Sequence, residues 1–166
     1  MDKKDLQNPA LYTNRELSWL LFNKRVLSEA RDKQLLLFER LKFLSITASN
    51  LDEFFMVRIG SLVDMIHAEY TKKDIAGMSA KEQLDALMEE THKFAALQYS
   101  TYNRMLLPQL RANGLNFVEH HEQLTERQAQ YVDEYFEENV YPVLTPMAVD
   151  SSRPFPLIRN KTLNIG

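Results

Sequence analysis

Apolar side chains recur every three or four residues along most of this chain, and this spacing predicts amphipathic helices. The first helix is expected to start at Thr13, because Thr13 and Glu16 have the spacing of a capping box. It is expected to run to about Arg31. Its apolar face is broad, which indicates contact with neighbours on more than one side. That face comprises Leu17, Trp19, Leu20, Leu21, Phe22, Val26 and Leu27.

Three more helices are predicted, with a loop before the last one. The helices cover residues 35–48, 51–70 and 80–113, and the loop covers residues 71–78. Ser49 or Asn50 is expected to interrupt the chain, because both residue types favour helix starts. A second capping box, Ser79 with Glu82, is expected to open the last and longest helix. Pro108 should kink or break that helix near its end.

The character of the sequence changes after Gly114, which is well placed to stop a helix. Residues 115–119 are short and alternating, so they are expected to form a strand. A fifth helix is predicted over residues 125–141, opened by Thr125. Residues 161–166 look like the start of another strand. A lone strand cannot satisfy its backbone hydrogen bonds, so we expect the chain to stop inside a second domain.

Composition narrows the possible functions of the 166-residue chain. Its 20 basic and 23 acidic residues give a net charge of -3, which argues against a general nucleic-acid binder. It contains no cysteine, so disulfides, thiolate metal sites and cysteine nucleophiles are excluded. No apolar run suits a membrane span or a signal peptide. We therefore expect a cytoplasmic protein with no nucleic-acid partner and no membrane span.

Two acid–histidine pairs on predicted helices have the spacing of metal ligands. Glu89 and His92 match the Glu-x-x-His motif of di-iron bundles, and Asp64 and His67 nearly repeat it. Such a site also needs inward carboxylates from two other helices, and nothing in the pattern marks the available ones as inward. The available carboxylates are Glu16, Glu29 and Glu39. We expect ordinary solvated helix faces and no metal site.

Two adjacent histidines, His120 and His121, lie beside the predicted strand between Glu119 and Glu122. They have the chemistry to bind a metal ion or to transfer protons. A zinc site needs three or four protein ligands, and no third ligand is evident nearby. A solvated turn is therefore the favoured interpretation of this pair.

The segment from Ser49 to Glu53 admits two interpretations. Ser49 or Asn50 would cap the following helix, and the acidic residues behind it would favour the positive end of the helix dipole. Alternatively, the Asn50 amide offers a donor and an acceptor side by side, which match the edge of adenine. From the residues alone, the cap is favoured. Arg58, further along, is either half of a surface salt bridge with Asp52 or Glu53 or a clamp for an anion.

Three segments, in order, carry a family resemblance. Residues 12–27 read YTNRELSWLLFNKRVL and resemble the opening of the long-chain polyphosphate kinases. Residues 39–44, ERLKFL, resemble its next segment, and residues 49–58, SNLDEFFMVR, match the pattern that follows. A weaker similarity continues through Pro142 and Thr145-Pro146. The resemblance covers nearly the whole chain, and its first and third motifs are specific.

The resemblance implies a mainly α fold, with an N-terminal helical bundle over residues 1–113. Residues 114–166 would be the truncated beginning of an α/β head domain. The family transfers the terminal phosphate of ATP reversibly to polyphosphate, using Mg²⁺ and a phosphorylated histidine. The matching asparagine is Asn50, which is expected near adenine and leaves capping to Ser49. The catalytic histidines belong to a later region, so none of the four histidines of this chain takes that role.

These expectations concern the full-length enzyme, whose partners would be ATP, polyphosphate, its remaining domains and further copies of itself. The chain itself is expected to contain no catalytic residue, to bind no metal ion and to be inactive alone. It has no glycine-rich phosphate loop, which agrees with a catalytic centre in other parts of the enzyme. A non-catalytic helical interaction module is the alternative function.

Overall fold

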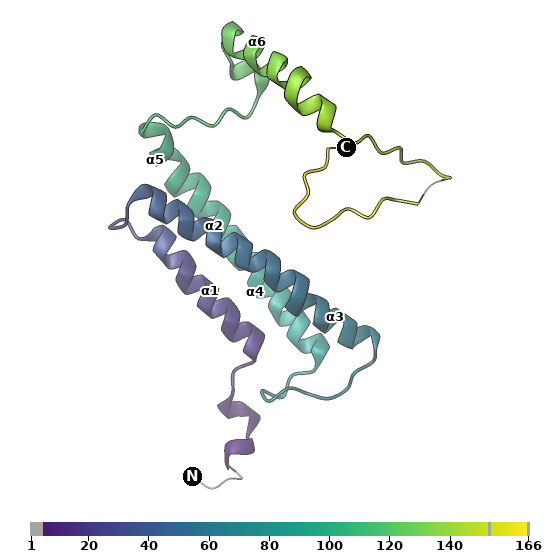
Figure 1. The fold of residues 1–166 in the computed structure, drawn as a ribbon. Coiled ribbons are helices and arrows are strands. Elements are labelled where there is room, and N and C mark those ends of the chain that lie inside the picture. The colour runs from purple at the N-terminus through teal and green to yellow at the C-terminus, as the bar shows by residue number, and fades with distance from the viewer. Residues whose placement is uncertain (1–4, 153, 166) are drawn as a thin grey trace. The chain divides into compact units, whose positions relative to one another are not determined.

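The computed structural model describes residues 5–152 and 154–165, drawn as a ribbon in Figure 1. The chain separates into two compact units, one that ends at Asn116 and one that begins at Phe117. The domain boundary predicted after residue 113 stays a prediction.

Helices make up the regular structure of the described part of the first unit. Two short 3-10 helices, Asp5–Gln7 and Pro9–Leu11, come before them. The α-helices are α1 (Arg15–Arg31), α2 (Leu37–Phe54), α3 (Gly60–His67), α4 (Ala80–Thr101) and α5 (Leu107–Ala112). Two π-helical segments, η3 (Phe55–Ile59) and η4 (Tyr102–Leu106), join α2 to α3 and α4 to α5 without a break. The predicted helical bundle is confirmed.

The bundle consists of three continuous helical rods that run in alternating directions (Figure 1). They are α1, then α2 with η3 and α3, then α4 with η4 and α5. The first rod packs against both of the others, because α1 contacts α2 and α4. The end of the second rod, α3, packs against α4. This arrangement explains the broad apolar face of α1, which is contacted on two sides.

The interruption predicted at Ser49 or Asn50 is wrong. Both residues lie inside α2, which continues to Phe54 and then through η3. The prediction failed because serine and asparagine disfavour helix interiors only when their side chains compete for the local backbone. Here the Asn50 amide bonds instead to a side chain on α1. The apolar stripe on both sides of these residues keeps the rod continuous.

Pro108 neither breaks the last rod nor ends it. A proline has no N–H to donate and its ring clashes with the carbonyl four residues earlier. Immediately before it, the helix widens into η4, where the Leu107 N–H donates to the Tyr102 carbonyl five residues back. A π turn accommodates an irregularity that an α-helical ladder cannot. The predicted kink or break is therefore replaced by a local widening.

The helix ends follow local rules in most places. The capping box of Ser79 and Glu82 is confirmed at the start of α4. Gly114 stops α5 with φ +83, and the bond from the Leu115 N–H to the Leu110 carbonyl completes a Schellman motif. The capping box predicted at Thr13 is wrong by one residue. Asn14 is the cap, and its Oδ1 accepts from the backbone N–H groups of Glu16 and Leu17.

The core contains two apolar clusters separated by polar side chains. One cluster is built on Leu20, Phe54, Ile59, Leu62, Ala80 and Leu87, and the other on Leu27, Ala30, Leu44, Phe94 and Leu106. Trp19 stacks on Phe54 with ring centroids 4.4 Å apart, which ties α1 to the end of α2. Asn23 and Thr47 lie between the clusters along α1 and α2, and both are fully buried.

The second unit buries none of its described side chains. Its helices are η5 (His121–Gln123), α6 (Glu126–Tyr135), η6 (Phe136–Val140) and η7 (Tyr141–Val143). The capping box at Thr125 is confirmed, with Gln128 as its partner. The strand predicted over residues 115–119 is wrong, and residues 161–165 form no strand either. Gly166, the end of that second prediction, lies outside the described residues.

No helix in the described ranges combines the length and the apolar character that crossing a membrane requires.

An ion-pair group on α4 connects it to α1. The Lys24 Nζ lies 2.7 Å from the Glu90 Oε2, and the Lys93 Nζ lies 2.9 Å from the Glu90 Oε1. Hydrogen bonds from Lys24, which has the larger effect, and from Lys93 lower the pKa of Glu90 to about 2. Hydrogen bonds to Glu89 and Glu90 raise the pKa of Lys93. The Lys24–Glu90 pair is thus a salt bridge between two rods.

Glycine-to-alanine substitutions at two positions should have opposite effects on stability. Gly60→Ala should stabilise the bundle by about 0.5–1 kcal/mol, because alanine favours the helix and its Cβ would meet only the Phe55 carbonyl at 3.8 Å. Gly114→Ala should destabilise it by roughly 1 kcal/mol, because its φ is positive although the space around it is open. Urea unfolding followed by circular dichroism measures both. Changes of the same sign would contradict the assigned helix end.

The Glu90 salt bridge should make stability depend on pH in a defined window. The pKa of Glu90 is about 2 in the fold against an ordinary 4.5, so its contribution is complete above about pH 4.5 and is lost as the pH falls towards 2. Glu90→Gln should therefore reduce the fall in unfolding free energy between pH 5 and 3. Because the side chain is one-third exposed, the difference should be no more than about 1 kcal/mol.

Glu89→Gln is the matched control for this effect. Glu89 makes an ion pair with Lys93 on its own helix and shares that lysine with Glu90. It does not bridge α4 to α1, so its removal should leave most of the pH dependence in place. If both variants show the wild-type pH profile of unfolding free energy, the bridge between rods contributes nothing measurable.

Candidate functional site

Asn50 lies inside α2, one turn before its end, and is half-buried and faces α1. Its Nδ2 donates a hydrogen bond to the Asn23 Oδ1 at 3.1 Å. The capping interpretation is therefore wrong for both Asn50 and Ser49, because no helix starts here. Asp52 and Glu53 lie in the last turn of α2 and do not face a helix start. The structural role of Asn50 is instead to join two rods.

Asn23 extends this contact into the core. Its exposed fraction is 0%, and its Nδ2 donates to the Thr47 carbonyl at 3.2 Å. On the far side of Thr47, the Gln98 Nε2 donates to the Thr47 hydroxyl at 3.0 Å. We call Asn50, Asn23, Thr47 and Gln98 the polar layer. It crosses from α2 to α1, back to α2 and on to α4.

The half-buried Asn50 amide retains hydrogen-bonding capacity after its bond to Asn23. A primary amide has two N–H donors and a carbonyl with two lone pairs. The bond to Asn23 uses one N–H, which leaves a donor and an acceptor side by side. Adenine presents the complementary pair, an exocyclic amine beside a ring nitrogen. The chemistry expected of Asn50 from the sequence is therefore compatible with its position.

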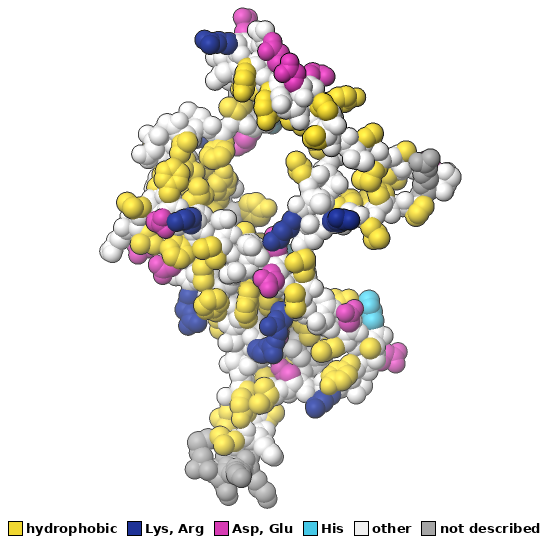
Figure 2. Space-filling view, in the orientation of Figure 1, with side chains coloured by type: hydrophobic (Ala, Val, Ile, Leu, Met, Phe, Trp, Pro, Cys, Tyr) yellow, Lys and Arg dark blue, Asp and Glu magenta, His cyan; other side chains and the backbone are white. Residues whose placement is uncertain are grey.

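Exposed apolar side chains lie near Asn23 and near Asn50 along the chain. Phe22 precedes Asn23 on α1 and is 48% exposed, and Ile46 lies one turn before Asn50 and is 47% exposed. Figure 2 shows hydrophobic side chains spread over the visible surface of the helices. Exposed apolar and aromatic side chains can stack on the face of a base.

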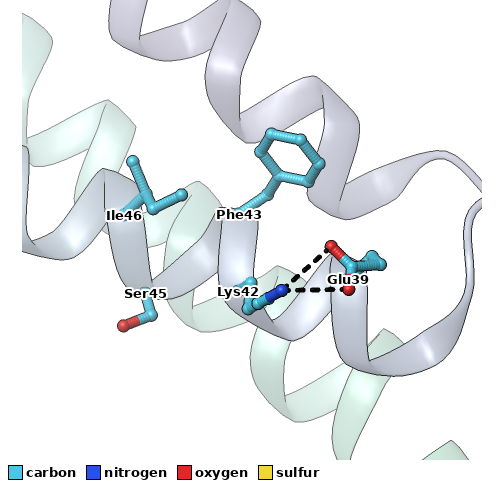
Figure 3. Close-up of a pocket in the computed structure, with 5 residues that line it drawn as sticks. All are labelled: Glu39, Lys42, Phe43, Ser45 and Ile46. Atoms are coloured by element: carbon cyan, nitrogen blue, oxygen red, sulfur yellow. Dashed lines mark hydrogen bonds and ion pairs between the residues drawn. The ribbon is translucent and has the colours of Figure 1, made fainter.

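A surface depression of about 330 Å³ lies nearer the start of α2 than Asn50 does (Figure 3). All the residues that line it belong to this one helix, and Asn50 is not among them; they are Glu39, Lys42, Phe43, Ser45 and Ile46. The Lys42 Nζ forms an ion pair with the Glu39 Oε1 at 3.0 Å. Lys42, the cation of this depression, is therefore already ion-paired with a carboxylate of the same helix.

Arg58 belongs to η3 and contacts α1. Its Nη1 lies 3.7 Å from the Glu16 Oε1, and the Arg15 Nε lies 3.2 Å from the same oxygen. Arg58 thus forms a salt bridge, as one interpretation expected, but its partner is Glu16 and not Asp52 or Glu53. Glu16 is mostly buried, whereas the Arg58 side chain is 41% exposed. The anion-clamp alternative stays a prediction.

The acid–histidine pairs are not assembled into a site. Across the described residues, no group of three or more histidine and acidic side chains has the geometry to hold a metal ion. His67 and His92 are both exposed, and Glu89 is ion-paired with Lys93. In the second unit, the His121 Nε2 lies 3.0 Å from the Asp133 Oδ1. These contacts are those of ordinary surface residues.

Three buried polar residues were missed in the sequence. Asn23 follows Leu20 by three residues, so its place in the apolar stripe of α1 was the available signal. Asn14 bonds through Nδ2 to Asp74 and Gln83, which fixes the loop before α4. Arg40 donates to the Ala30 carbonyl and to Gln109, while its Nη2 has no partner among the described residues. Its charge gave no hint of burial.

Comparison with known protein families matches almost the whole chain. Residues 12–118 match the polyphosphate kinase N-terminal domain, and residues 127–166 match the polyphosphate kinase middle domain. The first match spans the bundle, including the polar layer. The second match begins inside α6.

Individual relatives agree with these matches. A polyphosphate kinase of Lactiplantibacillus plantarum is 53% identical over 93% of this chain and 21% of its own length. One of Bacillus anthracis is 46% identical over 97% and 23%. The crystal structure of polyphosphate kinase from Porphyromonas gingivalis superposes with a TM-score of 0.67 at 32% identity, over 87% of this chain and 20% of that one. The chain spans about a fifth of the length of these relatives, and it belongs to the polyphosphate kinase family.

Proposed function

We propose that this chain is the nucleotide-contacting helical part of an enzyme that transfers the terminal phosphate of ATP reversibly to polyphosphate. Its family membership supports the overall reaction. Within that reaction, the proposed role of the bundle is to hold the base of ATP and to pack against the rest of the enzyme. We also propose a cytoplasmic location, in line with an ATP substrate and a cysteine-free sequence.

The observation that carries this proposal is the state of the Asn50 amide. It is half-buried, fixed by a hydrogen bond to Asn23 and still able to offer a donor and an acceptor. An amide held in this way loses little further freedom when a base binds, so its hydrogen bonds favour binding more strongly. A freely rotating surface asparagine would lack that advantage.

The chemical step requires groups that the bundle does not supply. Phosphoryl transfer needs cations around the transferred phosphate, usually Mg²⁺ with arginine or lysine. The residues described in this structure include no cluster of ligands fit for a metal ion. We therefore assign Mg²⁺ binding, the phosphorylated histidine and polyphosphate contacts to other parts of the enzyme.

A second candidate function is a non-catalytic interaction module. The observation that favours it is exposed apolar surface on the bundle, where Leu21, Met56 and Val57 are each at least half exposed. Surface of this kind suits packing against other domains or further copies of the chain. The two functions are compatible, and the nucleotide proposal is distinguished by its dependence on Asn50.

Replacing Asn50 tests the proposed function in the full-length enzyme that carries this segment. Asn50→Ala should raise KM for ATP by about 5- to 150-fold, because an amide–adenine pair contributes ~1–3 kcal/mol. The base is remote from the reacting phosphate, so kcat should fall much less than KM rises. Steady-state kinetics with ATP as the varied substrate measure both parameters.

Two controls separate nucleotide contact from loss of stability. Ser49→Ala changes the exposed neighbour on the same helix and should leave KM for ATP at the wild-type value. The Asn50→Ala enzyme should lose about 1 kcal/mol of stability, because its hydrogen bond to Asn23 is removed. If KM for ATP is unchanged in Asn50→Ala while thermal unfolding occurs earlier, Asn50 is structural and the proposed function is wrong.

A further inference from the structure

The orientation of the buried Asn23 amide is determined by its surroundings. The Thr47 backbone carbonyl can only accept hydrogen bonds, so the Asn23 group that faces it at 3.2 Å must be the NH₂. Its Oδ1 consequently faces Asn50. With an exposed fraction of 0%, Asn23 has no contact with bulk water that would satisfy the flipped arrangement. A flip would place two oxygens against each other on one side and two donors on the other.

This orientation determines the orientation of the next amide. The Asn23 Oδ1 can only accept, so Asn50 must turn its Nδ2 toward it, as the 3.1 Å distance records. The Asn50 carbonyl oxygen is therefore not the group that meets Asn23. The donated hydrogen bonds thus run inward, from the half-buried Asn50 side chain through Asn23 to the Thr47 carbonyl in the core.

We propose that Asn23 is a positioning residue that fixes the Asn50 amide in one orientation and thereby selects a 6-amino purine over a 6-oxo purine. This inference rests on the proposed function of Asn50 and adds a determinant of base choice. In the fixed orientation, the outward carbonyl of Asn50 accepts from the exocyclic amine of adenine. The second Nδ2 hydrogen remains for a ring nitrogen.

The selectivity follows because the fixed Asn50 amide cannot present a donor to an oxygen at position 6 of the purine. Guanine carries an oxygen where adenine carries the amine, and an oxygen would meet the Asn50 carbonyl oxygen without a proton between them. A freely rotating asparagine would flip by 180° and donate to that oxygen. Flipping Asn50 in this structure breaks its bond to Asn23 or forces Asn23 away from the Thr47 carbonyl. Each alternative leaves a buried polar group unpaired, which is costly.

Asn23→Thr in the full-length enzyme tests the proposal. A hydroxyl rotates and either donates or accepts, so threonine keeps a polar partner without dictating the orientation of Asn50. The preference for ATP over GTP, measured as a ratio of kcat/KM values, should fall at least about fivefold. Part of that fall should be a gain in GTP use, which simple loss of structure does not produce. Asn23→Val removes the hydrogen bonds to the Thr47 carbonyl and to Asn50. It should also lower the preference for ATP over GTP.

Gln98→Met is the matched control. It removes the hydrogen bond to the Thr47 hydroxyl at the other end of the polar layer and does not touch Asn23 or Asn50. It should lower the temperature of thermal unfolding without changing the ATP/GTP preference. In an Asn50→Ala background, Asn23→Thr should cause no further change in preference, because it acts through Asn50.

The outcomes separate this proposal from the proposed function. If Asn50→Ala leaves KM for ATP and the ATP/GTP preference unchanged, the proposed function itself fails. If Asn50→Ala narrows the preference while Asn23→Thr and Asn23→Val retain it in full, the positioning role is overturned and the base contact stands. If Gln98→Met narrows the preference as much as Asn23→Thr, the effect is general loosening of the bundle, and the positioning role is again overturned.

Discussion

A fully buried amide between two apolar clusters, Asn23, constrains the whole bundle. Its donor and acceptor have no access to water, so both must be satisfied by side chains or carbonyls of neighbouring helices. A slide of α1 along α2 would leave the amide unpaired at a cost of about 1–3 kcal/mol. Apolar clusters tolerate small shifts better than hydrogen bonds do. A single buried polar residue can therefore set helix register, as it does in coiled coils.

The same register determines what faces solvent. Because Asn23 must meet the Thr47 carbonyl, α2 presents Asn50 to α1 and leaves its amide half-buried at the edge of the bundle. The Trp19–Phe54 stack holds this pairing one turn further along. A position that satisfies the core and reaches the surface is a suitable place to bind a rigid ligand, since the scaffold has already ordered the side chain.

Local signals in the sequence predicted helix ends correctly. They gave wrong predictions where contacts between distant segments determine the secondary structure. The boxes at Ser79 and Thr125 and the stop at Gly114 need only residues within one turn, so they could be predicted from the sequence. The break at Ser49–Asn50 was wrong because a partner on α1, invisible to local rules, satisfies the amide. The strand over residues 115–119 was wrong because a strand requires a partner. Asn50 itself was identified through the family motif, whereas Asn23 required the packed structure.

Two departures from regular helix structure lie close together in the second rod. An asparagine occupies the interior of α2, and five residues later η3 replaces the α-helical ladder with a π turn. Each departure costs stability in isolation, and π turns recur at functional sites. Here η3 brings Arg58 to Glu16 and buries Ile59 in the apolar core. Departures from local rules are expected where function constrains a fold. In residues 50–59 these departures coincide with side-chain contacts from the second rod to α1, made by Asn50 to Asn23 and by Arg58 to Glu16.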